Sequence, residues 1–489
     1  MARIFLTRAR LLAEPTSSIA PPLGLMYLAA VLRQAGHDVH IHDMGSTCNN
    51  MHHLRQTLLR SRPHVMGISA LQSEVDCLGR IAGVVRECFP AVPVVVGGAL
   101  ASSDPLRCLN IPGVDYVVLG EGERTMVELV QALGHQNGIP TSIAGIGFLD
   151  DHGEVRYTPP RPLLEDLDLL PLPAWDLVNV DFYQAYSAAN ICAPGRFPVF
   201  SSRGCPCRCV YCHSTLGKSF RGHSPQRVVE EIQHLKHHYG AKDIAFLDDI
   251  FNFDQTRMRE ILRRIIRADL GLTLSFPNAL RPDMLDRELI ALLREAGTRV
   301  LVFAVETSSP RLQRLIGKRL QLDKARRNIE YALAEGLFTG AYFMLGFPTE
   351  TYEEARNTVC FALESDLHTA SFSRVLPFPG TELFAMCGEI IRERSLDLDV
   401  LDAAVYSRSS LNLSAMTDRQ LTNLHRTAYL KFYGSPSRVM RVWSDFPYGK
   451  RLLINQSRYV FEAVMPAWLR WRRPAEYTPP VGGCFQDMT

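Results

Sequence analysis

Four cysteines lie within eight residues near the middle of the chain, in residues 203–213 (RGCPCRCVYCH). Clustered thiolates are soft ligands that favour zinc or an iron–sulfur centre. A closed zinc site normally pairs two C-x2-C units across a longer spacer, and here one such unit is present, Cys209 to Cys212. With Cys205 the spacing becomes C-x3-C-x2-C, which gives a 4Fe–4S cube three ligands and leaves one iron open for binding. The spacing therefore favours a cluster, and zinc stays an alternative.

The overall composition is that of an ordinary globular protein. The 489 residues predict two to four domains at roughly 150 residues each. Apolar residues make up 46% and charged residues 21%, and a net charge of +2 gives no strong field to attract nucleic acid. We see no secretory signal and no uninterrupted apolar run of about 18 residues. A long chain with one cysteine cluster is typical of a cytoplasmic protein with metal or redox chemistry at that cluster.

Residues 1–135 alternate strand-like and helix-like segments. Each strand-like run is rich in Val and Ile and enters a Gly or Ser turn, and the runs read, in order, ARIFLT, HDVHIHD, HVMGISAL, VPVVVGGAL and VDYVVLGEGE. Repeated β-α units of this kind form a parallel, doubly wound sheet that binds ligands at the carboxyl ends of its strands. The pattern predicts an α/β domain of the Rossmann-like type.

A second β-α series occupies residues 196–390. Its candidate strands are FPVFSS, DIAFLDD, LTLSFPN, RVLVFAVET, FTGAYFMLGFP and ASFSRVLPF. Six strands separated by helices predict a (βα)6-type partial TIM barrel, in which chemistry occurs on the loops after the strands. The cysteine loop follows the first of them. Residues 136–195 predict a hairpin and a proline-rich connector between the two domains.

Residues 391–489 predict a mostly helical C-terminal region. Its segment 459–474 (YVFEAVMPAWLRWRRP) combines aromatic and arginine side chains. A packed terminal helix, bent at Pro466, is favoured for this segment. Peripheral contact with a membrane surface stays an alternative.

The cysteine loop resembles the signature of the radical S-adenosylmethionine (SAM) enzymes, C-x3-C-x-aromatic-C after the first strand of a β/α barrel, with Tyr211 at the aromatic position. The resemblance implies a 4Fe–4S cluster on Cys205, Cys209 and Cys212. It also implies that the open iron binds the amino and carboxylate groups of SAM, whose cleavage gives a radical that abstracts hydrogen from an unreactive carbon. Cys207 has no counterpart in that family, and we interpret it as an unligated bystander.

Further segments resemble that family, each after a candidate strand: FLDDIF, FPNALRPD and VETSSPRLQRLIGK. The resemblance implies contacts with SAM from Tyr211, Asp248, Asp249, Asn278, Arg281 and Glu306. Asp248 and Asp249 are acceptors suited to an ammonium group, and Arg281 is suited to a carboxylate. The alternatives are a helix cap for either aspartate and for Glu306, and an exposed salt bridge for Arg281.

Residues 1–135 resemble the cobalamin-binding domain attached to many radical SAM proteins, through PPLGLMYLAAVLRQAGHDVHIHD, VMGISAL, VVVGGALAS and VVLGEGERT. The resemblance implies that cobalamin lies against Ser69, Gly97, Gly98, Gly120, Glu121, Gly122 and Glu123. Small residues at strand ends let a bulky ligand approach the backbone, although ordinary tight turns use the same residues. The D-x-H-x-x-G motif of enzymes whose histidine binds cobalt is absent, so no histidine ligand is expected.

Taken together, these resemblances imply an enzyme that transfers a methyl group from cobalamin to an unactivated carbon. A radical cyclisation, ring rearrangement or carbon–carbon coupling without methyl transfer is the alternative. A zinc- or cluster-bearing structural or redox-sensing protein is a second one. The expected partners are a small-molecule substrate and a flavodoxin or ferredoxin as reductant. A hydrophobic substrate such as a lipid, terpenoid or tetrapyrrole is a hypothesis, and no side chain that acts on the substrate is identified.

Overall fold

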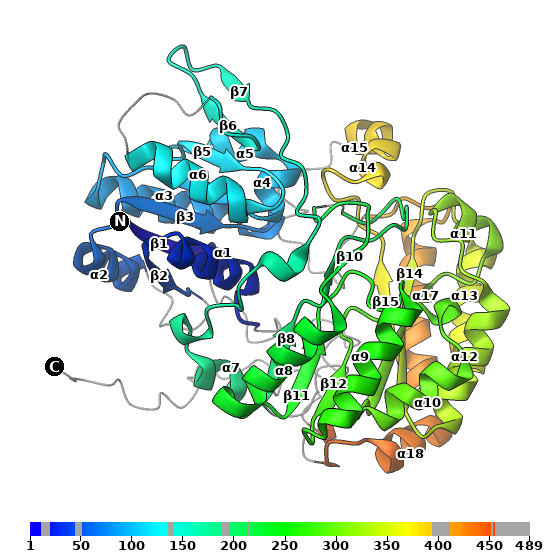
Figure 1. Ribbon diagram of the computed structural model, residues 1–489. Coiled ribbons are helices and arrows are strands. Elements are labelled where there is room, and N and C mark those ends of the chain that lie inside the picture. The colour runs from blue at the N-terminus through cyan, green and yellow to red at the C-terminus, as the bar shows by residue number, and fades with distance from the viewer. Residues whose placement is uncertain are drawn as a thin grey trace.

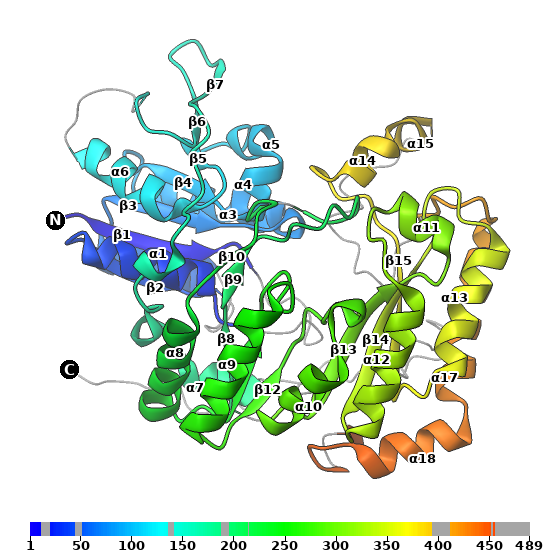
Figure 2. The same cartoon turned by 45° about the vertical axis from the view of Figure 1, so that its right-hand side comes forward.

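The chain folds into two α/β units, and the N-terminal unit lies above the second one in both views (Figures 1 and 2). The computed structural model describes residues 1–10, 20–44, 51–134, 141–186, 195–213, 215–393, 411–450 and 453–454.

The N-terminal unit contains a seven-stranded sheet in the order β2-β1-β3-β4-β5-β6-β7. Five of its strands pair in parallel, which confirms the predicted doubly wound domain. They are β1 (Arg3–Arg8), β2 (Asp38–His42), β3 (Val65–Ser69), β4 (Val94–Gly97) and β5 (Tyr116–Val118). The helices are α1 (Leu23–Gln34), α2 (Met51–Ser61), α3 (Val75–Cys88), α4 (Ala99–Ser103), α5 (Pro105–Leu109) and α6 (Gly122–Gly134).

Two separate hydrophobic clusters lie against this sheet. One includes apolar side chains of α1 and α6, and the other includes those of α2 and α3. Successive residues of β1 alternate between them, since Ile4 and Leu6 belong to the first cluster and Phe5 to the second. Such alternation is expected of a strand whose two faces are both covered by helices.

The predicted hairpin belongs to the first sheet rather than standing apart in the connector. It consists of β6 (Ile146–Leu149) and β7 (Val155–Tyr157). β6 pairs antiparallel with β5, placing Gly147 opposite Val117. The connector continues through α7 (Val180–Tyr186) and packs on α1, where the Ala174 amide donates to the Met26 carbonyl at 3.1 Å.

The second unit is the predicted partial barrel. Its strands are β8 (Arg196–Val199), β11 (Asp243–Phe246), β12 (Thr273–Ser275), β13 (Val300–Glu306), β14 (Phe338–Leu345) and β15 (Thr369–Arg374). They form two parallel three-stranded sheets, which the isolated bridges Leu274–Thr298 and Leu280–Phe303 join. The surrounding helices are α8 (Pro225–Tyr239), α9 (Gln255–Ala268), α10 (Arg287–Glu295), α11 (Pro310–Leu315), α12 (Leu322–Ala334) and α13 (Tyr352–Glu364).

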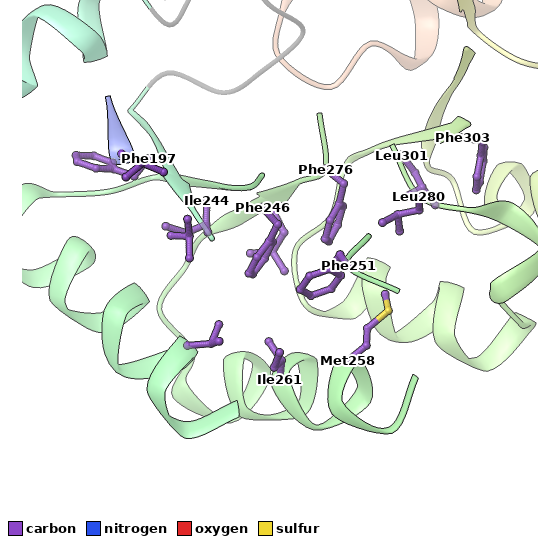
Figure 3. Close-up of a cluster of buried hydrophobic side chains, with 14 of the residues drawn as sticks. Phe197, Ile244, Phe246, Phe251, Met258, Ile261, Phe276, Leu280, Leu301 and Phe303 are labelled. Atoms are coloured by element: carbon purple, nitrogen blue, oxygen red, sulfur yellow. The ribbon is translucent and has the colours of Figure 1, made fainter. Parts of the chain in front are cut away.

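An aromatic core fixes the first three barrel strands to α9. Figure 3 shows Phe246, Phe251 and Phe276 between the strands and the helix, with Met258 and Ile261 facing them from α9. The rings of Phe246 and Phe276 stack with centroids 5.5 Å apart, a separation at which aromatic pairs attract each other. This packing holds the strand ends that carry the candidate site.

Two short helices, α14 (Glu382–Met386) and α15 (Gly388–Glu393), lead into the C-terminal region, whose described part is mostly helical, with α17 (Asp418–Tyr433) and α18 (Pro436–Asp445). Tyr429 and Tyr433 of α17 bond the backbone of β15 at Phe372 and Ala370, at 2.8–3.2 Å. These hydroxyls satisfy the polar groups of an edge strand. Segment 459–474 lies outside the described residues, and within the described part no helix has the length and apolar character needed to cross a membrane.

Candidate active site

The cysteine loop lies between two short strands, β9 (Ser202–Arg203) and β10 (Arg221–Gly222), which pair antiparallel. Gly204 opens the loop with a left-handed φ of +78°, and a Cβ there would lie 2.3 Å from the Ser219 carbonyl oxygen. Only glycine fits this position. Its amide also bonds the carboxylate of Asp249, so the first turn of the loop is tied to the end of β11.

Backbone contacts hold the loop from two further sides. The Val210 amide donates to the Ile316 carbonyl at 3.0 Å, and the Val210 carbonyl accepts from the Leu383 amide at 2.8 Å. At Gly317 the two chains touch so closely that a Cβ would lie 2.2 Å from the Arg208 carbonyl oxygen. The turn between α11 and α12 and the start of α14 therefore set the path of the loop.

The three predicted ligands differ in exposure, with Cys209 buried, Cys205 half-buried and Cys212 exposed. Contact with the Cys212 thiol and the nearby Lys318 ammonium lower the pKa of Cys209 to about 7, although burial opposes them. A cation beside a buried thiol favours the thiolate that binds iron. Contact with Cys205 and the Arg281 guanidinium similarly lower the pKa of Cys207 to about 6.

The donor set of the loop fits an iron–sulfur cluster. The thiols of Cys205, Cys209 and Cys212 are soft donors of the kind that such a cluster binds. A zinc ion needs its thiolates at about 2.3 Å from one point, whereas the thiolates of a 4Fe–4S cube bind separate irons. The described cysteines also form no disulfide. The loop therefore fits the cluster that its spacing favours.

Glu306 lies at the end of β13 in a strained conformation. Its φ is +66°, and the register with β14 shifts between Ala304 and Glu306. A left-handed non-glycine residue costs about 1–3 kcal/mol and such residues cluster at functional sites. The Lys318 Nζ lies 3.0 Å from its Oε1, and the two side chains are only 8% and 11% exposed. Burial and the charge of Glu306 raise the pKa of Tyr211, so the structure brings Tyr211 and Glu306 together.

Sequence reasoning missed Lys318, although it lies within the VETSSPRLQRLIGK segment. Its charge acts on Cys207, Cys209 and Cys212 as well as on Glu306. A lysine directly after a glycine, at the end of a helix that follows a barrel strand, was the available signal. Its position at the cysteine loop makes it a further candidate for binding SAM.

We expect Lys318→Met to lower the free energy of unfolding by about 3–5 kcal/mol, because it leaves the buried Glu306 carboxylate without its cation. The KM for SAM should also rise. Lys318→Arg, which keeps the charge, is the matched control. Its free energy of unfolding and its KM for SAM should both lie much closer to the wild-type values. Thermal unfolding and 5′-deoxyadenosine formation at varied SAM would measure these effects. A methionine variant with unchanged stability and KM would contradict this account.

The two adjacent aspartates after β11 face different surroundings. Asp248 is buried and accepts from the hydroxyls of Ser201, at 2.7 Å, and Ser202. Burial raises its pKa despite these hydrogen bonds. Asp249 is exposed beside Gly204. Asn278 donates to the carbonyls of Leu247 and Asp248 at 2.8 and 3.2 Å. Asp248 and Asn278 thus interlock the strand ends, while Asp249 is open to a ligand.

Arg281 lies against the cysteine loop. Its Nη1 is 3.4 Å from the Cys207 Sγ, while its Nε and Nη2 donate to the two carboxylate oxygens of Asp283 at 2.8 and 3.2 Å. A paired guanidinium held in this way has a fixed orientation. The structure therefore places Arg281, with Tyr211, Asp249 and Glu306, around the predicted cluster.

Small residues at the carboxyl edge of the N-terminal sheet let a ligand approach the backbone. A Cβ on Gly97 or Gly120 would meet nothing within 4 Å. Gly98 has a φ of +90°, and a Cβ there would lie 2.8 Å from the Oγ of Ser69 at the end of β3. Gly122 begins α6. An open edge of this kind fits cobalamin, which needs close backbone approach.

The carboxyl edge of the N-terminal sheet faces the carboxyl ends of the barrel strands. Glu121, after β5, binds Arg203 at 3.1 Å and Arg221 at 2.9 Å. Elsewhere along the same edge, the Gly380 backbone touches Ser103, since a Cβ on Gly380 would lie 2.9 Å from the Ser103 Cβ. Figure 2 shows β9 and β10 between the two units. Glu121 and Glu123 thus contact the barrel's arginines instead of the open edge.

Comparison with known proteins identifies the two domains that carry these edges. Residues 9–130 match the B12 binding domain model and residues 199–362 match the Radical SAM superfamily model. An uncharacterized methyltransferase from Pyrococcus horikoshii is 33% identical over 427 residues, which cover 86% of this chain and 89% of that protein. The chain belongs to the cobalamin-binding radical SAM family. It is a radical SAM enzyme whose cofactors are a 4Fe–4S cluster, SAM and cobalamin.

Three further proteins are similar to the chain. The cytidylyl-2-hydroxyethylphosphonate methyltransferase of Streptomyces wedmorensis is 29% identical over 448 residues, 81% of this chain and 83% of that one. The anaerobic magnesium-protoporphyrin IX monomethyl ester cyclase of Rubrivivax gelatinosus is 24% identical over 411 residues, 83% and 73% of the two chains. The cobalamin-dependent SAM radical enzyme OxsB, with aqua-cobalamin bound, shares the fold at a TM-score of 0.72 and 14% identity, covering 95% of this chain and 80% of its own.

Proposed function

We propose that this enzyme transfers a methyl group to an unactivated carbon of a small biosynthetic intermediate. The observation that carries the proposal is the opposition of two carboxyl edges, the glycine edge at Gly97 and Gly120 and the cysteine loop, across the Glu121–Arg203 contact. A carbon that loses hydrogen and gains methyl must reach both cofactors in one cavity. The related methyltransferases support the same reading.

In this proposal the chain's own residues hold and orient the reactants. Cys205, Cys209 and Cys212 bind the cluster. Lys318 and Arg281 provide cations for the SAM carboxylate. When bound, the cluster supplies the electron that cleaves SAM, and cobalamin supplies the methyl group.

Three other predicted side chains complete the proposed SAM site. The exposed Asp249 carboxylate is suited to the SAM ammonium group, and Glu306 and Tyr211 close the site beside it. Cobalamin would lie over the small residues of the open edge, Ser69, Gly97, Gly98, Gly120 and Gly122. We place the reaction in the cytoplasm, where thiols stay reduced and a flavodoxin or ferredoxin can deliver electrons.

The test uses protein reconstituted anaerobically with iron, sulfide and cobalamin, together with a reduced flavodoxin as electron donor and SAM whose methyl group is fully deuterated. Small-molecule extracts of the source cells serve as the substrate pool. A product heavier by one trideuteromethyl group in place of one hydrogen is expected, and it should be absent with Cys209→Ala. Formation of 5′-deoxyadenosine without any labelled product would reject methyl transfer.

Radical cyclisation is the second candidate, because the magnesium-protoporphyrin cyclase aligns over most of this chain. The same experiment separates the two, since cyclisation consumes SAM without transferring the label. A hydrophobic substrate such as a lipid, terpenoid or tetrapyrrole remains part of the proposal. Retention of only polar molecules during purification would count against it.

A further inference from the structure

One carboxylate of the cobalamin-binding domain holds both ends of the cysteine loop. Arg203 is the last residue before the loop and Arg221 is the first residue after it, and the two lie directly opposite each other in the β9–β10 pair. The Oε1 of Glu121 is 3.1 Å from the Nη1 of Arg203 and 2.9 Å from the Nη1 of Arg221. Its Oε2 is 3.0 Å from the same Arg221 nitrogen. Glu121 therefore bridges the neck of the loop.

The positive charges of the two arginines at this neck are fully balanced only when Glu121 is present. Like charges directly opposite on paired strands repel each other, and Arg203, Arg221 and Glu121 are only 7–8% exposed, so water screens them little. Glu123 adds a second anion, with its Oε1 2.6 Å from the Nη2 of Arg203.

A backbone hydrogen bond from the connector also holds Glu121 in place. The Leu164 amide donates to its Oε2 at 2.9 Å. Arg221 in turn donates to the carbonyls of Leu164 and of Leu216, a residue of the cysteine loop itself, both at 2.7 Å. The guanidinium of Arg203 also lies 5.6 Å from the centre of the Tyr27 ring on α1, within the range of a cation–π contact. Connector, cobalamin domain and loop thus meet at one carboxylate.

We infer that Glu121 is a positioning residue for the iron–sulfur cluster, and that the docked cobalamin domain completes the cluster-binding loop. This differs from the cobalamin contact that the sequence predicts. Without the Glu121 charge, the two arginines push the neck apart. Cys205, two residues after Arg203, then moves relative to Cys209 and Cys212. The inference rests on the cysteine loop as the cluster site and is independent of methyl transfer.

The test compares anaerobically reconstituted full-length proteins. Glu121→Gln keeps the size of the side chain and removes its charge. We expect it to bind cobalamin as wild type does, judged by absorbance after desalting. Its reduced cluster should give a broadened electron paramagnetic resonance signal, and an iron chelator should extract the cluster about tenfold faster, as for other losses of outer-shell support.

Glu128→Gln is the matched control. Glu128 lies on α6, the helix that begins beside Glu121, and pairs with Arg161 of the connector, at 2.9 Å between Oε1 and Nη1. It touches no residue of the neck in the described structure. Its removal should leave the cluster signal and the rate of extraction at wild-type values.

Two outcomes would overturn the inference. Loss of cobalamin with an unchanged cluster would make Glu121 a cobalamin contact, and an unchanged cluster with normal cobalamin would make the bridge passive. If circular dichroism shows that Glu121→Gln does not fold, Glu123→Gln and Arg221→Lys are tested in the same assays. Both should alter the cluster signal and the rate of extraction less than Glu121→Gln would, and Arg221→Lys should alter them least because it keeps the charge. No readout requires a substrate, so a wild-type enzyme without methyl transfer would leave the inference standing.

Discussion

Cys209→Ala is expected to remove the iron–sulfur cluster and to reduce 5′-deoxyadenosine formation by roughly a thousandfold or more, because the cluster carries the difficult step. Cys209 is the most buried of the three predicted ligands, and its pKa is lowered to about 7 beside Cys212 and Lys318. Both features favour a bound thiolate at this position. Cys205→Ala and Cys212→Ala should have effects of the same size, since each of the three thiolates would hold one iron of the cube.

Cys207→Ala is the matched control, because it removes a thiol from the same loop without removing a predicted ligand. Cys207 contacts Arg281 at 3.4 Å, so a modest change in the KM for SAM is expected while the cluster stays. Iron and sulfide content, the visible spectrum and 5′-deoxyadenosine formation would measure all four variants. A Cys207 variant that loses its cluster as fully as Cys209→Ala would make Cys207 a ligand and would require a different loop.

The sequence predicted both α/β units because their strands are short apolar runs bounded by glycine, and each run becomes one buried parallel strand. The parallel pairing of these strands followed from β-α repetition. The hairpin at residues 146–157 was harder to place. Its own pattern indicates two paired strands, but its pairing with β5 through Gly147 and Val117 depends on contacts distant in sequence. Local periodicity does not encode which sheet a hairpin extends.

The candidate site was also predictable only in part from the sequence. The cysteine spacing is local, so the sequence alone indicates a cluster. Whether Asp248 or Asp249 is open to a ligand depends on which of two adjacent side chains turns toward Ser201 and Ser202, and only the fold decides it. The partner of Glu121 is likewise 100 residues away at Arg221. Glu121 therefore resembles a ligand contact in the sequence, although it contacts a second domain in the structure.

Gly317→Ala is the second change for which we expect a large effect. Its new Cβ would lie 2.2 Å from the Arg208 carbonyl oxygen and 3.1 Å from the Arg208 carbonyl carbon. Because both are backbone atoms, the peptide must move, and the next residue is the ligand Cys209. The change should also weaken the hydrogen bond from Val210 to Ile316, now 3.0 Å. We expect cluster occupancy after reconstitution to fall by about tenfold, the size typical of lost support around a metal site.

Gly240→Ala separates crowding from backbone strain. Gly240 ends α8 with a φ of +66°, close to the +68° of Gly317, but a Cβ there meets nothing within 4 Å. Both variants therefore pay the left-handed cost of about 1–2 kcal/mol, and only Gly317→Ala presses on the cysteine loop. Thermal unfolding should show the backbone cost in both variants and a further loss of stability from crowding in Gly317→Ala, whereas iron content should fall in Gly317→Ala alone. Equal cluster occupancy in the two variants would mean that the turn after α11 does not set the position of Cys209.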